Sequence, residues 1–324
     1  FVQDATLKKS VHRNLSCADC HAGIREVPHP DTLPPAQCAS CHATVAGEYG
    51  GSIHGVSHAM GASGAATCAD CHGSHAIMPV RDPESPVFKL SLPRTCARCH
   101  SNVGITKEYQ MKSPKAAAQY IDSIHGRALL QMGLIVAPSC KDCHGVHNIR
   151  RSVDRDSPIN HANIAATCGK CHLGVEKVYN ESIHGQLLAK GGGKGPVCIN
   201  CHSAHEIESP VGGKMKEISD ERCGKCHQDR LTHYRDTYHG KAMALGRPNV
   251  VDKVAACYDC HGFHDIIPVS DPRSHLSKEN IVKTCQQCHV GATARFAEYM
   301  PHANPLDGRH YPLLHAVFVA MTGL

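Results

Sequence analysis

Aromatic residues are scarce in this chain of 324 residues. It contains no tryptophan, 5 phenylalanines and 9 tyrosines, and aromatic residues make up 4% of the sequence. Aromatic side chains normally supply much of the buried area of a protein core. The composition therefore excludes an ordinary aromatic-rich core, and a chain of this length needs another source of apolar contact.

Two further absences narrow the classes of function. No run rich in lysine and arginine occurs, which argues against a nucleic-acid surface. The C-terminal apolar run HYPLLHAVFVAMTGL is shorter than the roughly 20 apolar residues that a bilayer span needs. This run is either the start of a membrane helix, a docking segment for another subunit, or the packed end of a monomer.

Cysteine and histidine are abundant, and their spacing is regular. The 20 cysteines form ten CxxC pairs, a histidine follows each pair directly, and no cysteine is left for a disulfide or a catalytic thiol. CxxCH is the attachment signature of c-type haem, in which both thiols form thioethers and the histidine is the proximal iron ligand. Zinc is the alternative, but a four-cysteine zinc site needs no histidine after each pair.

We therefore predict ten covalently attached haem c groups. Their propionates would turn the formal charge of +5 negative, to about −15 if all ionise. The predicted attachment cysteines are Cys17, Cys20, Cys38, Cys41, Cys68, Cys71, Cys96, Cys99, Cys140, Cys143, Cys168, Cys171, Cys198, Cys201, Cys223, Cys226, Cys257, Cys260, Cys285 and Cys288. The predicted proximal ligands are His21, His42, His72, His100, His144, His172, His202, His227, His261 and His289.

A unit with two CxxCH motifs recurs along the chain. In the clear copies a Ser/Thr-x-His-Gly element precedes CxxCHxxH, and a second CxxCH follows a loop. The first copy is degenerate, with SVH in place of SIHG and its extra histidine delayed to VPHP. We predict five two-haem units and a tail, with the boundaries 1–43, 44–103, 104–174, 175–230, 231–291 and 292–324.

The repeat also selects ten further histidines as distal iron ligands. The CxxCHxxH histidine follows the proximal histidine by three residues, on the same side of the haem, so we predict that it serves a neighbouring haem. His58 is an alternative to His54, and the roles of His302, His310 and His315 in the tail stay open. The predicted distal ligands are His12, His29, His54, His75, His125, His147, His184, His205, His239 and His264.

Histidine on both faces of every iron favours electron transfer over catalysis. A multihaem reductase, the alternative from another class, needs one open iron position or a weak ligand such as lysine, and no CxxCK occurs. Frequent proline and glycine predict mostly irregular chain with short helices and little sheet. We predict a helix through residues 115–133 into the SIHG element, whose glycine lets the backbone approach a haem.

The SxHG, CxxCHxxH and TCxxCH pattern, over residues 10–289, resembles the multihaem c-type cytochromes of bacterial and archaeal respiratory chains. The resemblance implies a haem-packed fold with stacked and T-shaped haem pairs. It also implies a periplasmic or extracellular protein, and we expect an export signal to have been removed. Some members are membrane-anchored carriers linked to quinol oxidation, and others form extracellular filaments. The partners implied are other redox proteins or copies of the same chain.

Overall fold

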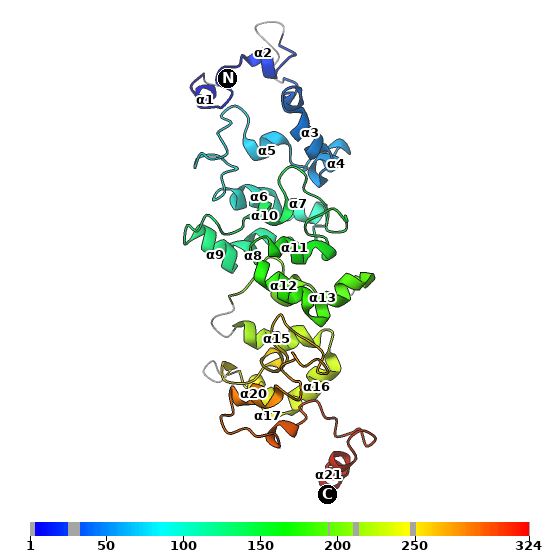
Figure 1. Cartoon of the computed structure of the whole chain (residues 1–324). Helices are drawn as coiled ribbons and strands as arrows, with labels where there is room; N and C mark the ends of the chain where they lie inside the picture. Colours follow the sequence, from blue (N-terminus) through cyan, green and yellow to red (C-terminus); the bar gives the residue numbers. More distant parts are fainter. Residues whose placement is uncertain (1–3, 25–32, 194, 210–213, 247–250, 324) are drawn as a thin grey trace. The chain divides into compact units, whose positions relative to one another are not determined.

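The computed structural model describes residues 4–24, 33–193, 195–209, 214–246 and 251–323. Short helices joined by loops make up this part of the chain, and no strand occurs among the described residues (Figure 1). The predicted fold class, short helices in largely irregular chain, is confirmed. The division into five two-haem units stays a prediction.

Two compact units are distinguished by their internal contacts. The first contains residues 1–167 and 204–207, and the second contains residues 168–203 and 208–324. Few apolar side chains are fully buried, and Leu129, Val197 and Val251 are the largest of them. The polypeptide therefore forms only a small apolar core of its own.

Helices carry or adjoin every CxxCH motif. We call the first motif of each unit the leading motif and the second the closing motif. The leading motifs lie on α2 (Cys17–Cys20), α5 (Cys68–His72), α10 (Cys140–His144), α14 (Cys198–His202) and α19 (Cys257–His261). The closing motifs lie on or begin in η1 (Cys38–Ser40), α6 (Leu92–His100), α11 (Ile164–Gly169), α15 (Lys214–Gly224) and α20 (Ile281–Gln286).

The remaining helices connect these motifs. Those that precede the SxHG elements are α3 (Ala43–Gly50), α7 (Val103–Glu108), α8 (Ala116–Asp122), α12 (Leu173–Glu181) and α16 (Gln228–Asp236). The SxHG elements themselves begin α4 (Ile53–Ala59), α9 (Ile124–Leu130), α13 (Ile183–Leu187) and α17 (Tyr238–Ala244). The others are α1 (Asp4–Lys8), η2 (His161–Asn163), the π-helical turn η3 (Leu188–Gly192), η4 (Phe296–Glu298) and α21 (Pro312–Thr322).

The SxHG serine breaks the chain into two helices, so the single helix predicted through residues 115–133 is wrong. Ser123 has an extended backbone, donates its hydroxyl to the Tyr120 carbonyl at 2.6 Å and accepts from the Gly126 amide. The serine therefore ends α8 and caps α9 at one point. Ser52, Ser182 and Thr237 make the same pair of hydrogen bonds.

A tyrosine three residues before each of these caps fixes the helix pair to the next leading motif. The Tyr120 hydroxyl donates to the carbonyl of Pro138, two residues before Cys140, at 2.7 Å. Tyr49, Tyr179 and Tyr234 make the equivalent bonds to Ala66, Pro196 and Ala255. The sequence motif is thus Tyr-x-x-Ser/Thr-x-His-Gly, and its tyrosine is not part of the repeat defined above from the sequence.

The SxHG glycine lies against protein backbone, which corrects its predicted role beside a haem. A Cβ on Gly126 would come within 2.0 Å of the Tyr120 carbonyl oxygen and within 2.8 Å of the Ile121 Cα. The corresponding distances to the tyrosine carbonyl are 2.0 Å at Gly55, 2.2 Å at Gly185 and 2.1 Å at Gly240. Only glycine allows the two helices to cross this closely.

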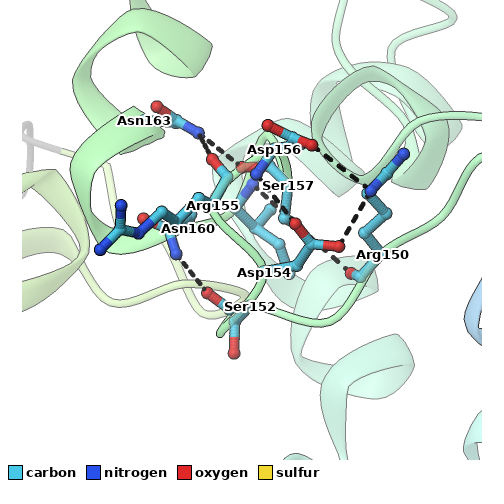
Figure 2. Close-up of polar contacts among 9 residues, drawn as sticks. Arg150, Ser152, Asp154, Arg155, Asp156, Ser157, Asn160 and Asn163 are labelled. Atoms are coloured by element: carbon cyan, nitrogen blue, oxygen red, sulfur yellow. Dashed lines mark hydrogen bonds and ion pairs between the residues drawn. The ribbon is translucent and has the colours of Figure 1, made fainter.

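Side-chain amides hold the loops before the closing motifs of the third and fifth units. In the third unit Arg150 contacts Asp154 at 3.0 Å and Asp156 at 3.6 Å, and the Asn163 amide donates to two loop carbonyls (Figure 2). Asn280 repeats the amide contacts in the fifth unit. The third and fifth units therefore share these amide contacts in the loop before the closing motif.

Candidate haem-binding sites

Each CxxCH motif forms about one turn of helix, which brings its two thiols and its histidine together. The backbone amide of His21 donates to the Cys17 carbonyl at 2.9 Å, and His42 donates to Cys38 at 3.0 Å. The closing motifs that end in His172, His227 and His289 form the same bond. The local fold therefore suits attachment of a flat group by two thioethers with the imidazole below it.

An acidic or amide side chain caps most leading motifs. Asp142, between the two cysteines of its motif, accepts from the amide and hydroxyl of Ser139 at 2.7 and 2.9 Å. Asp19, Asp70, Asn200 and Asp259 accept from the residue before the first cysteine in the same way. These bonds satisfy amides at the start of a very short helix and fix the direction of the first thiol.

Ring contacts join proximal histidines to histidines from elsewhere in the chain. Four closing histidines face the histidine of the SxHG element, or of SVH in the first unit, at ring-centre distances between 5.9 and 6.3 Å. These pairs are His12–His42, His54–His100, His184–His227 and His239–His289. In the second unit the partner is His54, and the alternative at His58 is not needed.

The leading histidines follow a different rule. The first four face the CxxCHxxH histidine of the following unit, at ring-centre distances between 5.9 and 6.2 Å. These pairs are His21–His75, His72–His147, His144–His205 and His202–His264. This arrangement agrees with the expectation that the CxxCHxxH histidine serves a neighbouring haem.

The spacing of the pairs fits an iron between them. An imidazole nitrogen bonds a metal at about 2.0 Å and lies roughly 1.1 Å from its ring centre, so two axial imidazoles place their ring centres about 6.2 Å apart. The observed distances of 5.9 to 6.3 Å bracket this value. The porphyrin would supply the other four ligands, so two histidines suffice on the protein side.

Zinc fits these residues less well. Within the described ranges, no group of three or more histidine, cysteine or acidic side chains is arranged to hold a metal ion. A structural zinc site takes four such ligands. The paired geometry thus agrees with haem.

Burial favours the neutral form of several of the paired imidazoles. The pKa of His144 is lowered to about 4. Burial is the largest cause, and the nearby His205 and His100 also contribute. Burial likewise lowers the pKa of His54, His72, His202 and His261. A neutral imidazole offers a free lone pair, the form that bonds a metal.

The predicted residues are found as follows. All twenty cysteines and all ten proximal histidines lie in the described ranges, whereas His29 lies outside them. His233, His275 and His310 contact aspartates at 3.3, 2.7 and 2.7 Å, which agrees with roles other than distal ligation. The sequence alone assigns no role to His302. In the structure its ring lies against His261, at a ring-centre distance of 6.2 Å.

The helical fold and the CxxCH sites together define a multihaem c-type cytochrome, an electron-transfer protein with covalently bound haem c. Residues 10–101 match the family model described as Cytochrome c3. No curated protein and no solved structure matches the chain.

Proposed function

We propose that the chain carries ten haem c groups, each with histidine on both faces of the iron, and conducts electrons along them outside the cytoplasm. The pairing of proximal with distal histidines at 5.9 to 6.3 Å carries this proposal. Haem c supplies reversible one-electron chemistry when it is bound. The chain contributes the thioether anchors, two imidazoles per iron and the spacing between successive sites.

Successive attachment sites lie close together, which supports conduction. Burial and a hydrogen bond to Cys38 raise the pKa of the Cys68 thiol, and a hydrogen bond to Cys168 lowers the pKa of Cys198 to about 7. These contacts join the closing motif of one unit to the leading motif of the next. Cys96–Cys140 and Cys223–Cys257 form the same kind of contact. Anchors in contact favour short distances between the groups that they hold.

The place of action follows from the class. Proteins with haem c are typically exported from the cytoplasm. We infer that this protein acts in the periplasm or at the cell exterior, with other redox proteins as electron donors and acceptors.

The C-terminal helix α21 bears on how the conduit is used. Its Leu313 and Met321 side chains are 79% and 75% exposed, so an apolar surface is available for contact. A second copy of the chain bound there would extend the conduit into a filament, which is the use that we favour. A membrane-associated carrier is the second candidate, although no described helix has the length and apolar character needed to cross a membrane.

Haem stoichiometry and ligand state test the proposal directly. A pyridine haemochrome assay of the purified holoprotein should give ten haems per chain. The ferric protein should show only low-spin signals, and the reduced protein should not bind carbon monoxide before denaturation. A high-spin fraction in the wild-type protein would instead support a reductase with an open haem. Negative-stain microscopy separates fibres with haem absorbance from discrete particles.

A further inference from the structure

Residues 292–324, which follow the fifth unit, contain no CxxCHxxH histidine that could face its leading histidine. Each earlier leading histidine faces the CxxCHxxH histidine of the next unit, as His202 faces His264 at 5.9 Å. No further CxxCH follows Cys285 within the 324 residues. By the same rule, His261 needs a partner of another origin.

His302 occupies that place. Its ring centre lies 6.2 Å from that of His261, with the two planes inclined by 23°. The His202–His264 pair, one unit earlier, is inclined by 28° at a similar distance. The two pairs are therefore alike in spacing and in orientation, although His302 comes from the tail.

The chain around His302 holds the ring in position. A turn closes beside it, where the Ala303 amide donates to the Met300 carbonyl at 3.2 Å. The His302 side chain is half-buried and lies near Arg230 on α16. The ring is therefore held between the tail and α16.

The other two tail histidines have different partners. The His310 Nδ1 lies 2.7 Å from Asp307, and the His315 Nδ1 lies 2.9 Å from the Pro305 carbonyl. The His310 ring is largely exposed, and neither contact involves a proximal histidine. These residues provide matched controls within the same segment.

We propose that His302 is the distal ligand of the haem attached through Cys257 and Cys260, so that a tail histidine takes the place that the CxxCHxxH histidine of the next unit holds at His202. This inference rests on the proposed histidine ligation of all ten haems. His302, a residue that the repeat does not contain, then replaces His29 as the tenth distal ligand, because ten irons need only ten; His29 itself lies outside the described residues.

The test uses the full holoprotein with the substitution His302→Ala. We expect ten haems per chain, a high-spin ferric signal equal to about one haem, and binding of about one carbon monoxide after reduction. Added imidazole should restore the low-spin signal. His310→Ala and His315→Ala should leave the wild-type spectra unchanged. A fully low-spin His302→Ala protein that binds no carbon monoxide would refute the inference.

Two outcomes keep this test separate from the proposed function. High-spin haem already present in the wild-type protein would refute histidine ligation of all ten haems, whatever His302 does. If His302→Ala does not accumulate, His302→Met replaces the ligand with a thioether, which raises the reduction potential of a haem. A redox titration of that variant should then show about one haem at higher potential, and an unchanged titration would also refute the inference.

Discussion

The crossing of helices α8 and α9 provides a sharp test of the SxHG element through the substitution Gly126→Ala. A Cβ at this position would lie 2.0 Å from the Tyr120 carbonyl oxygen and 2.7 Å from the Ile121 carbonyl oxygen. Both neighbours are backbone atoms, so no side-chain rotation can relieve the contact. The two helices must separate by about 1 Å to reach the shortest contacts found in proteins.

Overpacking of this kind typically costs about 1–3 kcal/mol. Because the contact is with backbone only, we expect the upper end, a loss of about 3 kcal/mol in the free energy of unfolding. The movement also displaces the neighbouring His125, a predicted iron ligand. Urea unfolding, followed by far-ultraviolet and Soret circular dichroism, should show the loss in both signals.

Gly47→Ala is the matched control, since Gly47 lies inside α3 with nothing within 4 Å of an added Cβ. Alanine should stabilise that helix by about 0.5–1 kcal/mol. Equal stabilities of Gly126→Ala and Gly47→Ala would refute the close crossing of α8 and α9.

Two further predictions concern the leading motifs. Ser203 has φ 63° and ψ 173°, a conformation that Gly73, Gly145 and Gly262 hold after three other leading histidines, so Ser203→Gly should raise the free energy of unfolding by about 1 kcal/mol. Gly73→Ser should lower the free energy of unfolding by a comparable amount in the same denaturation assay. A loss of stability in Ser203→Gly or a gain in Gly73→Ser would refute this prediction. Side-chain and backbone hydrogen bonds from Thr67 lower the pKa of Asp70, so its stabilisation is complete above its ordinary pKa and is lost as the pH falls through the lowered value. Urea midpoints measured between about pH 6 and pH 3 should therefore fall less steeply in Asp70→Asn, and an unchanged slope would contradict the assignment.

The sequence could predict features that depend on short spacing. CxxCH defines the thiols and the proximal histidine because all three lie within one helical turn. The neighbour rule for the CxxCHxxH histidine follows from the spacing of three residues from His72 to His75, which places both on one side of a ring. The structure places His75 against His21, from the preceding unit.

Features that depend on two crossing segments were not predictable in this way. The apolar spacing in residues 115–133 continues across Ser123, so periodicity alone gave one helix where there are two. The role of Gly126 depends on how closely α9 approaches the end of α8. A signal was nevertheless present, since Tyr120 and Ser123 recur at the same spacing as Tyr49 and Ser52.

His302 was not identified because it belongs to no repeat. Its position depends on the path of the tail back to α19, which residue spacing cannot give. Grouping the distal histidines by the unit that each completes would have shown the gap at His261. The number of predicted distal histidines, ten, equals the number of irons, so the count alone does not show that His261 lacks a partner from the repeat.

The ligand rule has a consequence for how such a chain is built. A leading motif completed from the next unit cannot mature alone, so each unit stabilises the one before it. A unit that no further unit of the same kind adjoins needs a distinct element in place of its neighbour. The proposed role of His302 would meet that need for the fifth unit without a further pair of cysteines. The number of two-haem units could therefore change, provided that a histidine from the following segment still reaches the final leading motif.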